Sequence, residues 1–253
     1  ILESFMKHLY NIEYIYIKNN TNKMEMLEVN HILTHVFNFK MSKKNEYFEY
    51  KNVFLKDPLF QNIKLSNHEQ TYIRGKPKEY LLHTINMFKN FTNSKLILEI
   101  GSIRSKMNHS IEAFNPGCCN DGHSTYFFSH YTNADIYTVD INPICKNIIE
   151  SDSRLQDVNA INTDAMKYAT SFDKNIDLLF LDAWDVVPNS PYAEAHLDIY
   201  NILKTKLSPK CIIVIDDTDV GNGGKGALLI PQLLKDGFLM IVNRRQSIFL
   251  RKL

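Results

Sequence analysis

The sequence lacks an excess of charge of either sign. Lys and Arg number 29 and Asp and Glu number 28, which gives a formal net charge of +1. Nucleic acids and anionic membranes attract proteins with a marked basic excess, so neither is the expected partner. No apolar run approaches the ~20 residues that span a bilayer, and the start of the sequence lacks the order of a secretory signal. We therefore expect a cytoplasmic protein that acts on a small molecule.

Cysteine is also scarce, and its placement indicates neither a zinc site nor a disulfide framework. Of the four cysteines, Cys118 and Cys119 are adjacent, Cys145 and Cys211 stand alone, and no pair has ligand spacing. Reduced thiols are expected. The 253 residues, 44% hydrophobic and 23% charged, suffice for one large folded domain or a domain with an appendage. The first residue is Ile1 rather than Met, which suggests a trimmed or internal fragment.

Two regions of the sequence differ in pattern. Residues 1–93 are rich in Asn, Lys, Tyr and Phe and carry no catalytic motif, so we expect an N-terminal extension or cap, or alternatively a lid over the other domain. Within them, residues 14–17 resemble a strand and residues 80–91 an amphipathic helix. Residues 94–253 form the second expected domain.

From residue 95 onward, short apolar runs alternate with longer amphipathic stretches, as in βαβ units. Their continuous hydrophobicity favours strands buried on both faces of a parallel sheet. The runs are residues 96–100, 136–139, 158–161, 176–181 and 211–215. Residues 237–242 and 247–250 add two strands joined by a polar turn, which predicts an antiparallel edge. The expected fold class is α/β: a doubly wound, Rossmann-like, mostly parallel sheet with an antiparallel last strand, plus the N-terminal extension.

Every expected strand end carries a carboxylate or a glycine. In open parallel sheets, ligands bind in the crevice outside the carboxyl ends of the strands, so these residues are the candidate site. In chain order they are Glu99 with Gly101, Asp140, Asp164, Asp182, and Asp216 with Asp217.

The first of these residues suit a nucleoside ligand. Gly101 allows a tight turn beside a ligand. Ser124 or Thr125 either caps the next helix or leaves free N–H groups facing an anionic ligand. Asp140 stands where a carboxylate accepts hydrogen bonds from ribose hydroxyls, although a helix cap explains it too. Asp164 either accepts from the amine of adenine or caps a short helix.

The last three carboxylates predict a metal site. Asp182, Asp216 and Asp217 would repel one another unless neutralised, and a hard divalent cation with oxygen ligands is the usual remedy. Alternatively, Asp217 and Asp219 merely cap or solvate the loop that leads into the glycine-rich residues 221–226. That stretch is not a phosphate-binding Walker A loop, because it follows a late strand and lacks the Lys-Ser/Thr ending.

Together these motifs resemble the class I S-adenosylmethionine-dependent methyltransferases. The resemblance covers residues 95–253, and the three-carboxylate pattern is similar to metal-dependent O-methyltransferases of the catechol and macrocin (sugar) type. It rests on Leu-Glu-Ile-Gly at 98–101, Val-Asp at 139–140, Asp164, Phe-Leu-Asp at 180–182 and Val-Ile-Asp-Asp at 214–217. It implies S-adenosylmethionine and Mg²⁺, or a similar divalent cation, as cofactors.

The resemblance also implies roles for particular residues. The turn at residues 99–101 would lie against the methionine part of the cofactor, Asp140 would hold the ribose, and Asp164 with Ala165 would meet the adenine. The implied cofactor-binding residues are Glu99, Gly101, Ser102, Ser124, Thr125, Asp140, Ile141, Asp164 and Ala165. The implied metal ligands are Asp182, Asp216 and Asp217, and the candidate catalytic residues are Asp182, His196 and Asp185.

The sequence departs from this family at two places. Residues 102–121 stretch the first glycine-rich loop, and Asp185 stands near where many relatives have a histidine, with His196 coming later. His196 titrates in the range useful for a base, although a plain helix-surface histidine is the alternative. Trp184 and Tyr192 would pack against a sugar face or shield the core.

Three functions follow as hypotheses. The first is Mg²⁺-assisted O-methylation of a small molecule, with a sugar or glycoside hydroxyl as the expected acceptor. The second is an NAD-dependent sugar oxidoreductase, which is disfavoured because residues 101–104 lack the GxGxxG spacing. The third is an inactive module that binds the cofactor without turnover. A homo-oligomer is compatible with all three.

Overall fold

The computed structural model describes residues 14–18, 33, 39–44, 47–52, 78–108, 123–243 and 245–251. Within them, seven strands form one sheet in the order β6-β5-β4-β7-β8-β10-β9. The strands are β4 (Leu96–Ile100), β5 (Asp135–Asp140), β6 (Val158–Asn162), β7 (Ile176–Leu181), β8 (Leu207–Ile215), β9 (Phe238–Asn243) and β10 (Ser247–Arg251). The helices are α3 (Lys78–Phe91), α4 (Ser124–Tyr131), α5 (Pro143–Ser151), α6 (Ala165–Ser171), α7 (Tyr192–Leu203) and α8 (Leu229–Lys235), with 3₁₀ turns η4 (Ser153–Leu155), η5 (Lys204–Lys206) and η6 (Gly224–Gly226).

The predicted fold class is confirmed, including the antiparallel last strand. Strands β4 to β8 pair in parallel, and the last strand, β10, runs antiparallel to both β8 and β9. These two final strands form the antiparallel edge that was expected, with β10 inside the sheet and β9 outermost. Burial explains the arrangement, because residues 247–250 are all buried, as an inner strand requires, whereas β9 is partly exposed.

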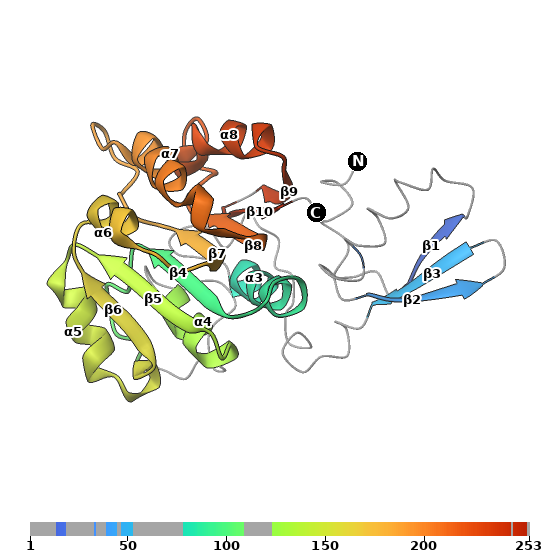
Figure 1. Cartoon of the computed structure of the whole chain (residues 1–253), viewed down its shortest axis with the longest axis horizontal. Coiled ribbons are helices and arrows are strands. Elements are labelled where there is room, and N and C mark those ends of the chain that lie inside the picture. Colours follow the sequence, from blue (N-terminus) through green and yellow to red (C-terminus); the bar gives the residue numbers. More distant parts are fainter. Residues whose placement is uncertain are drawn as a thin grey trace.

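Helices cover both faces of this sheet (Figure 1). Alternate residues of β7 enter opposite layers: Leu178 and Phe180 pack with α3 and α4, whereas Leu179 and Leu181 pack with α6, α7 and α8. A strand that is buried on both sides favours apolar residues throughout; β4 and β7 are buried at every position and each has one charged residue, Glu99 and Asp177. The interpretation of the continuous apolar runs as strands buried on both faces of a parallel sheet is therefore confirmed.

The helix expected over residues 80–91 is α3, and it belongs to the same core as the sheet. Its buried side chains Leu81, Ile85 and Phe88 join the cluster that contains the β7 residues Leu178 and Phe180. The domain boundary at residue 93 stays a prediction, but the structure packs α3, which precedes it, against the second domain.

A smaller antiparallel sheet lies on the N-terminal side. It contains β1 (Tyr14–Lys18), β2 (Phe39–Lys44) and β3 (Tyr47–Asn52) in the order β1-β3-β2, and β1 confirms the strand expected at residues 14–17. Figure 1 shows it set apart from the seven-stranded sheet. Cys145 and Cys211 are free thiols, as expected, whereas Cys118, Cys119 and residues 109–121 of the long loop lie outside the described residues.

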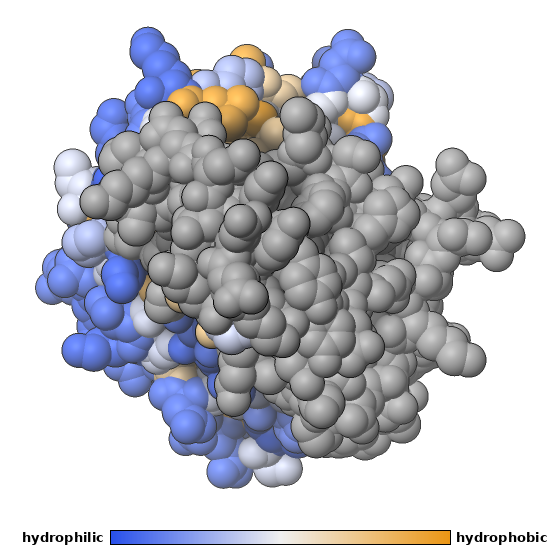
Figure 2. All heavy atoms as spheres, turned by 90° about the vertical axis from the view of Figure 1, so that its right-hand side faces the viewer, coloured by the Kyte–Doolittle hydropathy of each residue, from blue (hydrophilic) through white to orange (hydrophobic). Residues whose placement is uncertain are grey.

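Among the described helices, none combines the length and the apolar character that a membrane crossing requires. Figure 2 turns the molecule by 90° and shows a mostly hydrophilic described surface, with a hydrophobic patch along its upper edge. Leu228, just before α8, and Leu234, within α8, are among the exposed large apolar side chains.

Candidate functional site

The candidate site lies where the sheet order reverses, between β4 and β7. Gly101 follows β4 with a φ of 89°, its N–H donates to the Val139 carbonyl over 2.9 Å, and the Asp182 N–H donates to the Ile100 carbonyl over 2.7 Å. A Cβ atom on residue 101 would lie 2.7 Å from the backbone of Asp182 and Ala183. Only glycine fits there, so the tight turn predicted at Gly101 is confirmed.

Asp140 at the tip of β5 faces this turn. Its Oδ2 accepts from the Ser102 N–H over 3.0 Å and its Oδ1 from the Asn142 N–H over 2.8 Å. Beside it, the buried Ser102 hydroxyl has no hydrogen-bond partner among the described residues, and the Ile141 side chain is 72% exposed. The turn thus gathers a carboxylate, an unpaired hydroxyl and an exposed apolar side chain, a set of groups that suits a nucleoside.

Glu99, Ser124 and Thr125 have a supporting position. The Glu99 carboxylate is fully buried and accepts from the Ser124 hydroxyl over 2.6 Å and the Thr125 hydroxyl over 2.7 Å. The prediction that Ser124 or Thr125 caps α4 is wrong, because His123 is the N-cap and no side chain caps the helix. These hydrogen bonds fasten β4 to α4, and contact of the three residues with the cofactor stays a prediction.

Asp164 caps a helix, as the alternative interpretation held. Its Oδ1 accepts from the Lys167 N–H over 2.9 Å at the start of α6, and Ala165 is the buried first residue of that helix. Contacts of Asp164 and Ala165 with adenine stay a prediction.

The three predicted metal ligands do come together. Asp182 follows β7, Asp216 and Asp217 follow the adjacent parallel strand β8, and each offers an oxygen within 4.8 Å of the others. Asp217 and the nearby Trp184 have φ values of 51° and 53°, which are strained for residues other than glycine. Such strain is concentrated at functional sites in proteins.

The sequence analysis missed a fourth member of this cluster, Lys225 in η6. Its ammonium lies 2.7 Å from Asp182 Oδ1 and 2.9 Å from Asp217 Oδ2, and it also donates to the Asp182 carbonyl over 3.0 Å. The glycine-rich turn makes this approach possible: Gly224 has a φ of 49°, and a Cβ there would lie 1.7 Å from the Asp217 carbonyl oxygen. A lysine among glycines soon after a carboxylate pair was the signal available in the sequence.

Two more side chains complete the cluster. An Arg245 Nη atom forms an ion pair with Asp217 Oδ1, and the Gln246 amide donates to Asp216 Oδ1 over 3.1 Å. Asp216 itself is 1% exposed. The chain thus supplies two cations of its own, Lys225 and Arg245, to three carboxylates.

Lys225 carries its charge in this position. Burial by itself would lower the pKa of Lys225, but the carboxylates of Asp182 and Asp217 outweigh it, and the pKa is raised. The repulsion from which a divalent cation was inferred is therefore relieved in large part by the chain. Mg²⁺ stays a prediction, and the residues do not fit it while the Lys225 ammonium lies between two of the three ligands.

The candidate bases occupy different surroundings. His196 is fully buried, so the surface-histidine alternative is wrong; its Nδ1 lies 2.5 Å from the Tyr192 carbonyl and its Nε2 has no partner among the described residues. Burial lowers the pKa of His196 to about 4, so the ring is neutral at pH 7. Asp185 lies outside the carboxylate cluster and is exposed, and an Arg104 Nη atom pairs with it over 2.8 Å. Their catalytic roles stay predictions.

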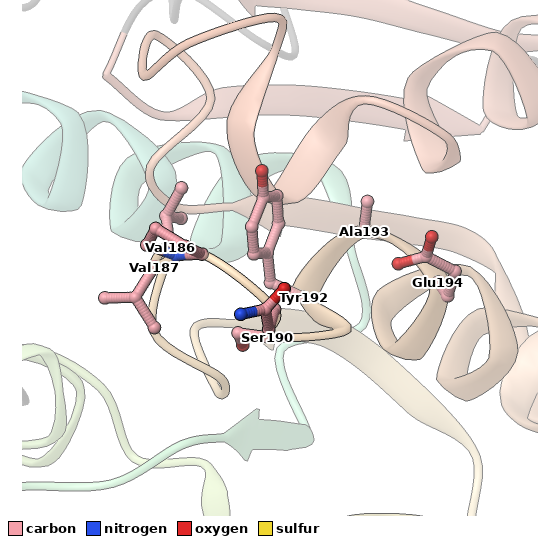
Figure 3. A pocket seen from close by; sticks show the side chains of 8 residues that line it. Val186, Val187, Ser190, Tyr192, Ala193 and Glu194 are labelled. Carbon is pink, nitrogen blue, oxygen red and sulfur yellow. The ribbon is translucent and has the colours of Figure 1, made fainter.

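A pocket of about 420 Å³ lies beside these residues, lined by residues 186–190 and 192–194 between β7 and α7. In Figure 3 the Tyr192 ring rises from the start of α7 next to Ser190, whereas Glu194 lies farther along the helix. Trp184 packs edge-on against the His196 ring at 5.4 Å and against the core, which supports the core-shielding alternative for this side chain.

Comparison with known proteins supports the fold and no more. No protein-family model matches the chain, and no curated protein matches it. Among solved structures, the methyltransferase PaMTH1 from Podospora anserina, solved with S-adenosylhomocysteine, has a TM-score of 0.50 and 15% identity over 91% of this chain and 96% of that one. A putative caffeoyl-CoA O-methyltransferase from Staphylococcus aureus has a TM-score of 0.48 and 16% identity, covering 69% and 84% of the two chains. A methyltransferase from Geobacter sulfurreducens has a TM-score of 0.46 and 12% identity, covering 70% and 80%.

Proposed function

We propose that this protein transfers the methyl group of S-adenosylmethionine to a hydroxyl oxygen of a small molecule. The observation that carries the proposal is the arrangement at the switch point, where Gly101, Ser102 and Asp140 lie next to a carboxylate cluster. Ligands of doubly wound sheets bind in this crevice. The similarity to methyltransferase structures concerns the fold alone and supports the proposal without deciding it.

The residues present fit the cofactor. The carboxylate of Asp140 would accept from the ribose hydroxyls, and the exposed Ile141 would cover one face of the adenine. The unpaired hydroxyl of Ser102, next to the tight turn at Gly101, would meet the methionine end. S-adenosylmethionine supplies a methyl group on a positively charged sulfur when bound.

Methyl transfer places simple demands on the acceptor side. The acceptor oxygen must lie in line with the methyl carbon; as the new carbon–oxygen bond forms, the carbon–sulfur bond breaks and the hydroxyl proton leaves. The partly exposed carboxylates of Asp182 and Asp217 are placed to accept hydrogen bonds from acceptor hydroxyls and to orient them. Asp182 is the best placed of the candidate bases, because His196 is enclosed and Asp185 is outside the cluster.

The finer hypotheses concern the acceptor and magnesium. A carbohydrate acceptor is supported by the polyol-binding potential of neighbouring carboxylates and by the pocket of residues 186–194. Magnesium assistance, in which the metal would template two hydroxyls, was expected from the convergence of Asp182, Asp216 and Asp217. The Lys225 ammonium lies between two of these carboxylates, so the transfer proposed here uses them without the metal.

Calorimetric titration with S-adenosylmethionine, S-adenosylhomocysteine and NAD tests the proposal. Both sulfur compounds should bind and NAD should not. Asp140→Asn should weaken binding roughly ten- to a hundredfold, because a charge-assisted hydrogen bond contributes about 1.5–3 kcal/mol. Asp135→Asn, at the opposite end of the same strand, is the matched control and should bind normally.

Transfer itself is measured with methyl-labelled cofactor and a panel of catechols and glycosides. Label should appear in an ether product. Failure of both sulfur compounds to bind rules out the proposal, whereas binding without transfer to any acceptor favours the inactive binding module.

A further inference from the structure

The Lys225 ammonium uses its whole hydrogen-bonding capacity inside the carboxylate cluster. A lysine ammonium has three donor hydrogens. Three oxygens lie within reach: Asp182 Oδ1 at 2.7 Å, Asp217 Oδ2 at 2.9 Å and the Asp182 carbonyl at 3.0 Å. The side chain is 2% exposed, so water does not compete for these bonds. The ammonium is thus surrounded by oxygens as a bound cation would be, although it is covalently part of the chain.

The backbone around Lys225 fixes it in this place. The Lys225 N–H donates to the Asp217 carbonyl over 3.3 Å, which ties the start of η6 to the end of β8. Gly224 packs against that same carbonyl without room for a side chain. On the opposite side, Thr218 and Ile230 crowd Gly226. The ammonium is therefore delivered by a loop of defined shape rather than by a surface side chain that happens to fold inward.

A divalent cation would compete for the same oxygens. Mg²⁺ and Ca²⁺ bind carboxylate oxygens at about 2.0–2.6 Å, which places the metal in the space of the ammonium and next to a like charge. The second oxygen of Asp217 is taken by Arg245, and Asp216 is almost wholly buried beside Gln246. Both carboxylate oxygens of Asp217 and the Oδ1 atoms of Asp182 and Asp216 are thus already engaged by the chain.

We propose that Lys225 is a built-in replacement for the divalent cation, so that the carboxylate cluster is assembled and used without a metal ion. In this arrangement Lys225 is a positioning residue: it holds Asp182 and Asp217 in the orientation in which they meet the acceptor. The consequence for catalysis rests on the proposed methyl transfer, whereas occupancy of the cation position does not.

Manganese titration followed by electron paramagnetic resonance tests the proposal, because free and bound Mn²⁺ are distinguished directly. The wild type should show no binding at the millimolar concentrations that typify weak oxygen-ligand sites, about 10⁻³ M. Lys225→Met removes the ammonium and keeps an unbranched side chain of nearly the same length, so it should bind Mn²⁺ at least about tenfold more tightly. Lys235→Met, an exposed lysine in the last turn of α8, is the matched control and should behave as the wild type.

The ligands of any gained site are checked with a second change. Adding Asp217→Asn to Lys225→Met should abolish the gained binding, and Mg²⁺ should displace Mn²⁺ from the single variant. Lys225→Arg, which keeps a positive charge, should remain without metal.

Two results would overturn the proposal. One is a wild-type Mn²⁺ site that Asp217→Asn abolishes, since it would mean that Lys225 gives way to the metal. The other is a folded Lys225→Met variant that binds Mn²⁺ no better than the wild type. If Lys225→Met does not fold, the wild-type titration decides alone. If the wild type does not bind S-adenosylmethionine, by contrast, the proposed function is wrong, but the manganese titration still tests whether Lys225 occupies the cation position.

Discussion

Gly101 and Gly237 form a matched pair for testing whether the switch-point turn needs space or only backbone freedom. Their φ values are 89° and 84°, so alanine is strained at both positions. A Cβ at Gly101 would lie 2.7 Å from the backbone of Asp182 and Ala183, whereas a Cβ at Gly237 meets nothing within 4 Å. The two substitutions therefore share one cost and differ in the other.

The expected magnitudes follow from these two costs. A left-handed backbone costs a residue with a Cβ roughly 1–2 kcal/mol, which is the whole expected effect of Gly237→Ala. Gly101→Ala adds overpacking against backbone that cannot rotate away, about 1–3 kcal/mol more. The total of roughly 2–5 kcal/mol is a large part of the stability of a typical domain, about 5–15 kcal/mol.

Urea unfolding of both variants measures the difference, with the midpoint shifting and the slope unchanged if two-state behaviour holds. Gly101→Ala should also weaken S-adenosylmethionine binding, because relief of the clash pushes residues 182–183 away from the turn; Gly237→Ala should not. Equal destabilisation by the two substitutions would refute the reasoning, since only backbone conformation would then matter at residue 101.

Two further predictions concern pH. The hydrogen-bonded Arg154 guanidinium holds the pKa of Asp152 well below its ordinary value, so Asp152 stabilises the fold above about pH 4 and this contribution fades as the pH falls further. Asp152→Asn should therefore lose most stability near neutral pH and least in acid. His196 gives a pH dependence of the same sign from a different cause: because burial lowers its pKa to about 4, from about 6.5 unfolded, acid protonates the unfolded chain first and stability again falls in acid. The stability of the wild type relative to His196→Gln should fall by about 3 kcal/mol between pH 7 and pH 4, and a constant difference over that range would contradict the burial of a neutral ring.

The sheet was largely predictable because burial on both faces leaves its mark on every residue of an inner strand. Residues 96–100 and 176–181 coincide with β4 and β7. The expected strand at 211–215 is shorter than β8, which begins at Leu207, because Ser208, Pro209 and Lys210 interrupt the apolar pattern. The hairpin of β9 and β10 was predicted too, but a hairpin pattern does not determine which of its two strands pairs with β8.

The site was predictable in its carboxylates and not in their partners. Strand ends bring Asp140, Asp182 and Asp216 to one edge, which follows from parallel pairing alone. Glu99 lies inside β4, and its carboxylate accepts hydrogen bonds from two hydroxyls of α4. Its nearness to the end of the strand in the sequence did not show that the side chain lies on the face of the sheet covered by α4. Lys225 is 43 residues from Asp182, and their contact depends on the left-handed turn at Gly224.

Backbone strain and charge are balanced in this cluster by the same loop. Asp217 and Trp184 are held at positive φ, each at a cost of the order of 1–3 kcal/mol, and such conformations persist only where surrounding interactions enforce them. For Asp217 those interactions are the ion pairs with Lys225 and Arg245 and the Lys225 N–H bond to its carbonyl. The glycine-rich stretch therefore does more than carry a cation to the strand tips: by bonding both the side chain and the carbonyl of Asp217, it fixes the conformation in which that carboxylate faces Asp182. The backbone N–H of residue 225 bonds the Asp217 carbonyl whatever occupies the cation position, whereas the contacts with Asp217 Oδ2 and Asp182 Oδ1 come from the Lys225 ammonium alone.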